Sequence, residues 1–295
     1  MKFKALLVAL CCLLAAGFAG AAEKPLVVVE GVQMPGWIEH ANGMRDPLAV
    51  GAALANSDRI ITGPGARVLM RLADGSQIKL GENAVLALDE LGRRKIKMKD
   101  VVSASLDVVK GAFRFTTSAL NRLRAERDVK VRIVTITAGI RGTDLWGKAD
   151  ATRDVVCLIE GDITVLRGDE AFTMNEPMSF YIAPKGQKGE PVAKVSAEQL
   201  KQWAAETEIA AGKGAARKGG KWRVTLAEAA TQDEALQVYD AVRKAGYAAD
   251  IRTQKNEEAL VYRVRVSHLA SRKDAEAVAA ALKGQFGITE PRVSQ

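Results

Sequence analysis

The hydrophobic and polar positions change their pattern twice along the chain. Up to about Pro184, hydrophobic residues alternate with polar ones in short runs, so that Val68, Met70 and Leu72 share one face of a predicted strand. The Asp74-Gly75 pair that follows is typical of a type I′ hairpin turn, because both central positions of that turn need a positive φ. Short strands separated by such turns predict an all-β sandwich or roll over residues 23–195.

A helical pattern replaces this alternation at residues 196–211. Hydrophobic positions there follow helical spacing, and Ser196 with Gln199 resembles a capping box. We expect Trp203 to pack this helix against the β domain. Residues 212–220 are rich in glycine, lysine and alanine, a composition that predicts a flexible linker. Their glycine spacing does not fit a phosphate-binding loop, so we expect no nucleotide site there.

The last segment, residues 221–295, alternates between strand and helix patterns. After a first strand, the pattern predicts a helix over 231–245, strands over 248–252 and 260–266, a second helix over 271–283 and a last strand. A glycine follows each predicted helix, as is common at helix ends. The order βαββαβ predicts a compact antiparallel sheet with both helices on one face.

The first 22 residues have the pattern of a secretory signal peptide. Lys2 and Lys4 precede an unbroken apolar stretch over 5–16, and small residues follow at 19–22. The stretch is shorter than the ~20 apolar residues that span a bilayer, and an uncleaved N-terminal anchor is the alternative. We expect a periplasmic protein that does not span a membrane after the signal peptide is cleaved.

Charge and reactive residues add little to this picture. The net charge of +8 is spread along the chain, so it gives weak attraction to anionic polymers without specifying nucleic acid. Cys157 lies in an apolar run and is expected to be a buried thiol. The two histidines, His40 and His268, fall in different predicted domains, and no hydrolase or metalloprotease motif occurs. We therefore expect no enzymatic activity, no cofactor and no metal site.

The segment 221–295 resembles a SPOR domain over nearly its whole length. The resemblance rests on Trp222-Arg223-Val224, Ala235, Gly246-Tyr247, Tyr262 to Val266 and Ala270 to Ala275. SPOR domains bind peptidoglycan glycan strands stripped of their stem peptides, on the open face of the sheet. The resemblance therefore implies peptidoglycan binding in the cell envelope, with cell division as one candidate process.

Strand alternation suggests which residues form this open face. If the valines at 264 and 266 face the helices, Arg263 and Arg265 face outward, and Arg223 and Thr225 alternate in the same way. Such side chains can donate hydrogen bonds to sugar hydroxyl groups and acetamido carbonyls. The alternative is an ordinary solvated sheet face without a ligand.

The segment departs from the SPOR pattern at positions that would contact sugar. Glutamine is usual where Thr225 lies, and aromatic residues are usual within 227–229 and 267–269. These departures imply weaker or altered affinity for glycan.

The β-rich region resembles a FecR domain over roughly residues 30–184. The resemblance rests on Ser57 to Gly63, Ala66 to Leu72, Ala73-Asp74-Gly75-Ser76, Leu80-Gly81, Thr137 to Asp144 and Leu158 to Gly161. In the founding family this domain is the periplasmic part of an anti-sigma regulator, which also has a transmembrane helix. Within it, we interpret Arg141-Gly142-Thr143-Asp144 as a bend between strands with a local ion pair, with a ligand loop as the alternative.

The leading hypothesis is a non-enzymatic envelope protein that binds peptidoglycan through the SPOR domain, with the FecR-like domain as a protein- or ligand-interaction module. The alternative is a periplasmic signalling protein that acts through the FecR-like domain on a membrane receptor or sigma-regulator system. A cell-wall enzyme would need a catalytic motif that the sequence does not show. Nucleic acid is not an expected partner, because the open strands carry no aromatic residue between their arginines.

Overall fold

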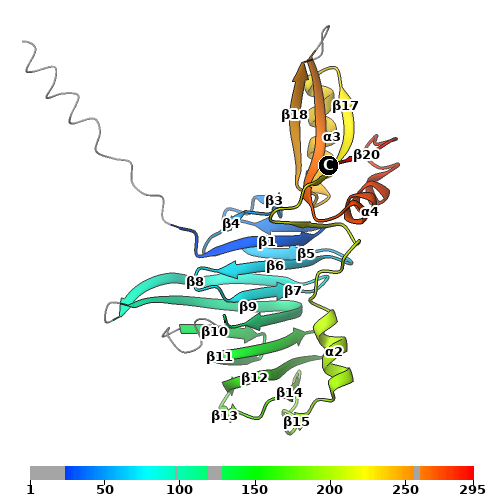
Figure 1. The fold of residues 1–295 in the computed structure, drawn as a ribbon. Helices are drawn as coiled ribbons and strands as arrows, with labels where there is room; N and C mark the ends of the chain where they lie inside the picture. Colours follow the sequence, from blue (N-terminus) through cyan, green and yellow to red (C-terminus); the bar gives the residue numbers. More distant parts are fainter. Residues whose placement is uncertain (1–23, 97–98, 119–127, 256–259) are drawn as a thin grey trace, which may run out of the picture.

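The computed structural model describes residues 24–96, 99–118, 128–255 and 260–295 (Figure 1). The predicted signal peptide lies outside these residues. The described part is mostly β and contains three helices, so the expectation of a β-rich chain is confirmed. No helix in this described part is long and apolar enough to cross a membrane.

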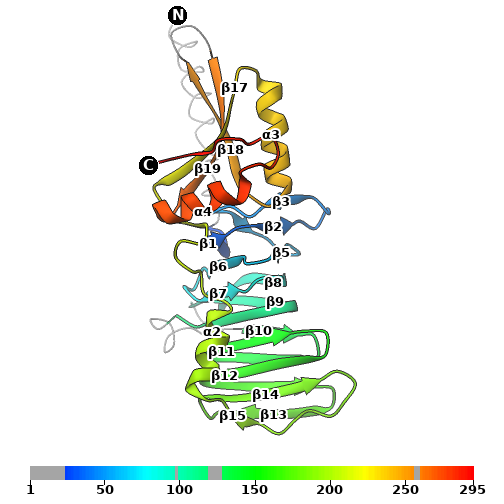
Figure 2. The same cartoon turned by 90° about the vertical axis from the view of Figure 1, so that its right-hand side faces the viewer.

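The N-terminal unit is built from strands that form two hydrogen-bonded runs. The first run is β1–β6–β7–β9–β11–β12–β14–β15, and the second is β3–β2–β5–β8–β9–β10–β11–β12–β13. The strands are β1 (Val27–Gln33), β2 (Gly36–Glu39), β3 (Arg45–Pro47), β4 (Ala53–Leu54), β5 (Arg59–Thr62), β6 (Arg67–Leu72), β7 (Gln77–Leu80), β8 (Val85–Ile96), β9 (Lys99–Thr116), β10 (Asp128–Ile133), β11 (Ile136–Ala149), β12 (Arg153–Arg167), β13 (Glu170–Met174), β14 (Ser179–Pro184) and β15 (Ala193–Lys194). Figure 2 shows them stacked one above another. Buried side chains of both runs belong to one hydrophobic cluster.

Three long strands, β9, β11 and β12, pass from one run to the other and bend at glycines. Gly111, Gly142 and Gly161 have φ values of +87°, +73° and +89°, a region that residues with a Cβ rarely adopt. A Cβ on Gly161 would lie 2.8 Å from the carbonyl oxygen of Gly142, and one on Gly111 would lie 2.5 Å from Cβ of Ala84. All three bends therefore need glycine for backbone conformation, and those at Gly111 and Gly161 need it for space as well. A bend between strands was expected at Gly142, and the structure places the bend inside the single strand β11.

Helix α2 (Ala197–Ala205) packs against the first run, as expected. The side chain of Ser196 accepts a hydrogen bond from the backbone N–H of Gln199 and caps the helix. The ring of Trp203 stacks on Trp146 with centroids 4.7 Å apart and planes 1° from parallel, and the edge of Phe180 meets it at 5.6 Å. Trp203 is thus the anchor of this helix.

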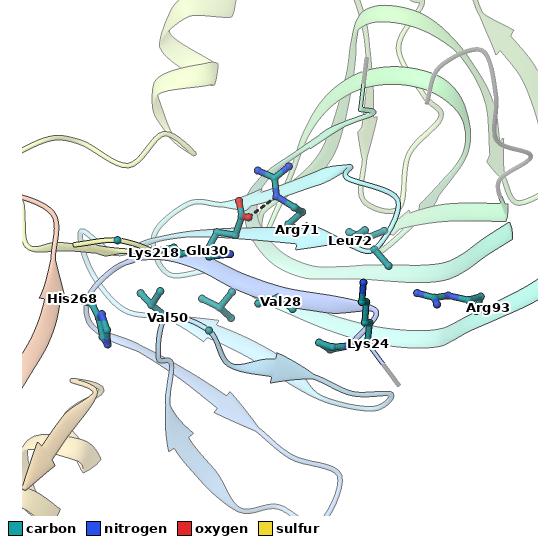
Figure 3. Close-up of a pocket in the computed structure, with 14 residues that line it drawn as sticks. Lys24, Val28, Glu30, Val50, Arg71, Leu72, Arg93, Lys218 and His268 are labelled. Carbon is teal, nitrogen blue, oxygen red and sulfur yellow. Dashed lines mark hydrogen bonds and ion pairs between the residues drawn. The ribbon is translucent and has the colours of Figure 1, made fainter. Parts of the chain in front are cut away.

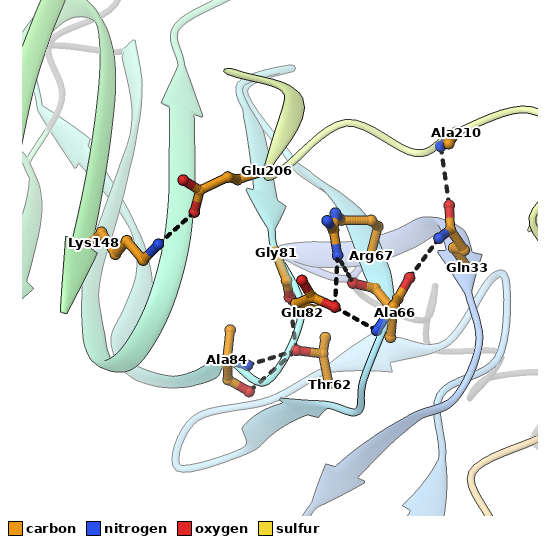
Figure 4. Close-up of polar contacts among 11 residues, drawn as sticks. Gln33, Thr62, Ala66, Arg67, Gly81, Glu82, Ala84, Lys148, Glu206 and Ala210 are labelled. Carbon is orange, nitrogen blue, oxygen red and sulfur yellow. Dashed lines mark hydrogen bonds and ion pairs between the residues drawn. The ribbon is translucent and has the colours of Figure 1, made fainter. Parts of the chain in front are cut away.

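The chain that leaves α2 runs back along the β unit and is held there by polar contacts (Figure 4). Nζ of Lys148 donates to Oε2 of Glu206 at 2.8 Å, and the backbone N–H of Ala210 donates to Oε1 of Gln33 at 3.0 Å. Gln33 is 7% exposed, so its amide group is used within the protein. These contacts carry the chain from one end of the β unit to the other.

The C-terminal unit contains one antiparallel sheet in the order β20–β17–β19–β18. Its elements are β17 (Trp222–Ala229), α3 (Gln232–Lys244), β18 (Ala249–Lys255), β19 (Leu260–Leu269), α4 (Arg272–Leu282) and β20 (Arg292–Ser294). Both helices cover the same face of the sheet (Figures 1 and 2). Their buried side chains, such as Val242 and Val278, pack with Val224, Val264 and Val266 of the strands. Among the described residues, no layer covers the opposite face of the sheet.

The segment 212–220 differs from the expected flexible linker, because it contains strand β16 (Ala215–Arg217). This strand pairs with β1 of the N-terminal unit and, through Ala216, with β19 of the C-terminal unit. The backbone N–H groups of Gly214 and Ala215 donate to Oδ1 of Asp274 at 3.1 and 3.0 Å, and Asp274 is 1% exposed. The backbone of the segment is therefore hydrogen-bonded on several sides, which fixes its conformation.

Direct contacts also join the two units beside β16. Nε1 of Trp37 donates to the carbonyl oxygen of Lys244 at 3.1 Å, and the ring of Trp37 lies against Gly246. Arg243 at the end of α3 forms an ion pair of 2.7 Å with Asp46 of strand β3. The sheet of the C-terminal unit is therefore held at a defined position on the N-terminal unit.

Candidate functional site

The open face of the C-terminal sheet displays three rows of polar side chains. Cross-strand partners point to the same face of a sheet, so the strand register defines each row. One row pairs Arg223 with Ser294. The remaining two rows are Asp250–Arg265–Thr225–Arg292 and Arg252–Arg263–Glu228. All four residues expected at the site, Arg223, Thr225, Arg263 and Arg265, are therefore placed together on this face.

Arg265 lies in the middle of its row and is held by an acidic neighbour. Its Nε and Nη2 are both 3.1 Å from Oδ1 of Asp250, and its side chain is 19% exposed. Oγ of Ser267 donates to Oδ2 of the same carboxylate at 3.2 Å. Asp250 thus fixes the guanidinium plane of Arg265 by a charge-assisted contact, while the remaining N–H groups stay available at the surface.

Arg263 is held in a similar way by Glu228 and Gln254. Its Nε lies 2.7 Å from Oε1 of Glu228, at ion-pair distance but without hydrogen-bond geometry. Its Nη1 donates to the side-chain oxygen of Gln254. Arg292 also reaches Glu228, at 3.5 Å. The Arg263 side chain is 35% exposed, so this guanidinium is positioned yet still faces solvent.

Arg223 and Thr225 occupy the strand next to these arginines. Nε of Arg223 donates to Oγ of Ser294 at 3.2 Å, and its Nη2 donates to the carbonyl oxygen of Gln295. Thr225 lies between Arg265 and Arg292 in the register and is half-buried. Its hydroxyl can both donate and accept, so it can replace only part of the amide chemistry of a glutamine.

The face carries a net positive charge. The rows contain five arginines, at 223, 252, 263, 265 and 292, and two carboxylates, those of Asp250 and Glu228. Each carboxylate contacts two of the arginines, which orders them without neutralising the face. Such a surface suits an extended ligand that offers many oxygen acceptors and some negative charge.

The sequence alone did not identify Asp250, Arg252, Glu228 and Arg292 as part of this face. Alternation along β18 could have placed Asp250 and Arg252 on one side of that strand, because residues i and i+2 of a strand lie on the same face. Simple alternation along β17 could not have placed Glu228 on this face, because the register of β17 shifts between Thr225 and Ala227. Arg292 lies on a strand of three residues, which carries too short a pattern to orient.

The residues that carry the FecR resemblance hold corners of the N-terminal unit. Oδ2 of the buried Asp58 accepts a hydrogen bond of 2.8 Å from the backbone N–H of Ala55. The buried hydroxyl of Thr62 donates to the carbonyl oxygen of Gly81 at 2.7 Å and accepts from the backbone N–H of Ala84 at 2.8 Å (Figure 4). These contacts give the motif a structural role.

The second FecR motif places a carboxylate at the bend of β11. Asp144 is 7% exposed and makes two contacts with Arg114, at 2.9 and 2.7 Å, and one with the hydroxyl of Thr116. This hydrogen bonding raises the pKa of Arg114. The expected partner of Asp144 was Arg141, whose side chain lies outside the described residues. Asp144 therefore joins two neighbouring strands at the point where the long strands change runs.

Cys157 is fully buried in β12, as expected from its apolar surroundings. Burial raises the pKa of its thiol to about 12. A thiol with this pKa is almost wholly protonated at neutral pH, so it is a poor nucleophile.

Two family models match the chain. The model described as FecR protein matches residues 58–164, and the model described as SPOR domain matches residues 218–289. Both are families of non-catalytic binding or regulatory domains. No curated protein matches the chain.

The chain is also similar to two crystal structures of a candidate anti-sigma factor from Parabacteroides distasonis. The sequence identities are 15% and 14%, and the TM-scores are 0.38 and 0.39. The alignments cover 69% and 68% of this chain, and 97% and 96% of the two structures.

Proposed function

We propose that this chain, which carries a FecR domain and a SPOR domain, is a non-enzymatic envelope protein that binds denuded glycan strands of peptidoglycan through the open face of its SPOR sheet. The observation that carries the proposal is the ordered arginine face, in which Arg263 and Arg265 are held by Glu228 and Asp250 on a surface that no described helix covers. The SPOR family itself implies peptidoglycan binding and a link to cell division.

The charge of the face explains a preference for stripped glycan. Removal of a stem peptide leaves a free carboxylate on the lactyl group of each muramic acid residue, so a denuded strand is a regular polyanion. Guanidinium groups that are already oriented can form charge-assisted hydrogen bonds to these carboxylates and further bonds to acetamido carbonyls. A strand that keeps its stem peptides has amides in place of these carboxylates, and the peptides obstruct close approach to the sheet.

The FecR domain would serve as a module for a protein partner in the periplasm. The far end of its unit presents β13 and β15, and within the described residues each of these strands pairs with one neighbour. A free strand edge offers backbone N–H and C=O groups to an added strand of another protein. A signalling role, in which the FecR domain engages a membrane receptor or regulator, is the alternative and would use the same end.

A sacculus pull-down tests the glycan proposal. The purified protein is mixed with intact sacculi and with sacculi that an amidase has stripped of stem peptides. We expect tighter retention on stripped sacculi, and a loss of about tenfold in affinity for each of Arg263→Ala and Arg265→Ala, because each removes charge-assisted hydrogen bonds. Equal retention on both kinds of sacculi, or unchanged binding of the two variants, would contradict the proposal.

The matched control for these variants is Arg272→Ala. Arg272 is an exposed arginine on helix α4, on the covered side of the sheet, where it pairs with Glu276 at 2.9 Å. This variant also loses one positive charge and one surface ion pair, so it reports any effect of net charge alone. We expect its binding to equal that of the wild type. The same samples should release no soluble muropeptides, as a binding protein without hydrolase activity predicts.

A further inference from the structure

A pocket of about 530 Å³ lies where the outer side of β1 meets the turn between β16 and β17 (Figure 3). Its floor is apolar and is formed by Val28, Val50, Leu72 and Pro25. Val28 is a half-exposed residue between the buried Val27 and Val29 of β1, so it points away from the core. An apolar floor of this size is typical of a small-molecule site.

Positive charge surrounds this floor. Lys24, Arg93 and Lys218 line the pocket, and the structure gives their side chains no hydrogen bond or ion pair with any described residue. In Figure 3, the charged end of Arg93 is turned toward Lys24, which comes from a separate segment. Two like charges that face one another repel, which is relieved when an anion lies between them.

Among the described residues that line the pocket, Glu30 is the one carboxylate, and it does not compensate these cations. Glu30 lies 2.5 Å from Nε of Arg71 and is engaged by that arginine (Figure 3). The pair is neutral, so Lys24, Arg93 and Lys218 leave an excess of three positive charges around an apolar surface. A neutral hydrocarbon would contact the apolar floor but would make no use of the three cations around it. A sugar would find few hydrogen-bonding groups on the floor.

We propose that this pocket binds a small amphipathic anion, an acyl-like chain that ends in a carboxylate or a phosphate. The apolar chain lies along Val28 and Val50, and the anionic head lies between Lys24 and Arg93. The methylene stem of Lys218 covers the chain while its ammonium group stays in solvent. This site is separate from the arginines of the SPOR face and goes beyond the proposed binding of glycan.

Isothermal titration of the purified protein with dodecanoate tests the proposal. We expect saturable binding at one site, about tenfold weaker binding of decanoate because two methylene groups are lost, and no binding of dodecyltrimethylammonium, which has the same chain and the opposite charge. Dodecyl phosphate in a parallel titration distinguishes the two head groups. Equal binding of the cationic and anionic amphiphiles, or no binding of either anion, would overturn the proposal.

Variants with matched controls locate the site. We expect Lys24→Glu/Arg93→Glu to weaken dodecanoate binding at least tenfold, because the head would then meet two carboxylates. Lys213→Glu/Lys273→Glu makes the same change of charge outside the pocket and should bind as the wild type does. If the control weakens binding as much as the pocket variant, the attraction is non-specific and the proposal fails. Retention on stripped sacculi, measured on the same samples, reports whether each variant is folded.

A second pair of variants tests the floor. Val28→Asp places a carboxylate under the apolar chain and should abolish binding of dodecanoate. Val109→Asp is the matched control, since Val109 is 48% exposed on β9 and does not line the pocket. Unchanged affinity in Val28→Asp would show that the chain does not lie on this surface.

Discussion

Substitution of Gly246 by alanine measures how tightly the two units are fitted together. Gly246 follows helix α3 with a φ of +87°, and it lies against the N-terminal unit. A Cβ at this position would be 2.6 Å from Cζ2 of Trp37 and 2.9 Å from Cβ of Pro35. Both distances are shorter than real Cβ contacts, so the tryptophan ring or the whole SPOR unit would have to move.

The expected cost has two parts. The left-handed backbone conformation costs a residue with a Cβ about 1–2 kcal/mol, and insertion of a methyl group into a packed contact costs about 1–3 kcal/mol more. Gly246→Ala should therefore lower the free energy of unfolding by about 2–5 kcal/mol. In a Trp37→Ala background the ring is absent, so most of the second part should disappear and about 1–2 kcal/mol should remain. The difference between the two backgrounds is the coupling energy of the contact.

Urea unfolding followed by circular dichroism and by tryptophan fluorescence provides the measurement. Coincidence of the two transitions shows whether both units unfold together, which a tight junction predicts. Gly284→Ala is the control, because Gly284 has a φ of +79° but no atom within 4 Å of its would-be Cβ. It should cost only the backbone term in both backgrounds. The reasoning is refuted if Gly246→Ala costs no more than Gly284→Ala, or costs the same with and without Trp37.

Three further predictions concern the N-terminal unit. The hydrogen bond with Asp58 raises the pKa of His40. The stabilising contribution of His40 is therefore full below the unfolded pKa of about 6.5 and is lost as pH rises through the higher folded pKa. The stability difference between the wild type and His40→Gln should therefore shrink as the pH is raised above about 6.5. Trp203→Ala should lower the free energy of unfolding by about 2–4 kcal/mol in urea melts, through loss of the stack on Trp146; Lys201→Ala on the same helix should have little effect. Cys157 should not react with a thiol reagent at about pH 8 until the protein is unfolded in urea.

The local sequence pattern was sufficient to predict elements in which hydrophobic residues recur at a fixed period or a turn has a typical sequence. Alternation over 260–266 correctly predicted that Arg263 and Arg265 lie on the side of β19 opposite Val264 and Val266. The hairpin between β6 and β7 was also correctly predicted, although its turn is not of type I′, because Gly75 has a positive φ and Asp74 does not. In both cases the deciding information lies within about six residues of the chain, where periodicity and turn chemistry act directly.

Bends within a strand were harder to separate from turns between strands. The apolar runs over 155–160 and 163–167, separated by Gly161-Asp162, predict two strands joined by a turn. The structure instead has one strand, β12, that bends at Gly161 and crosses from one run to the other. Both arrangements need a glycine with positive φ at this point. What distinguishes them is the close approach of Gly142 from the neighbouring strand, and that contact depends on the register of strands that are distant along the chain.

The predicted linker shows the same limit and has a consequence for function. A sequence rich in glycine and lysine lacks the apolar residues that order a segment by burial, but β16 is ordered by backbone pairing with β1 and β19 and by the carboxylate of Asp274. Composition does not encode these partners. Because the junction is fixed, a glycan strand on the SPOR face would also fix the direction of the FecR unit. Strands β13 and β15, which each pair with one described strand, lie at the end opposite the SPOR unit (Figure 1). A partner bound there would therefore be held away from the glycan strand by the length of the β unit.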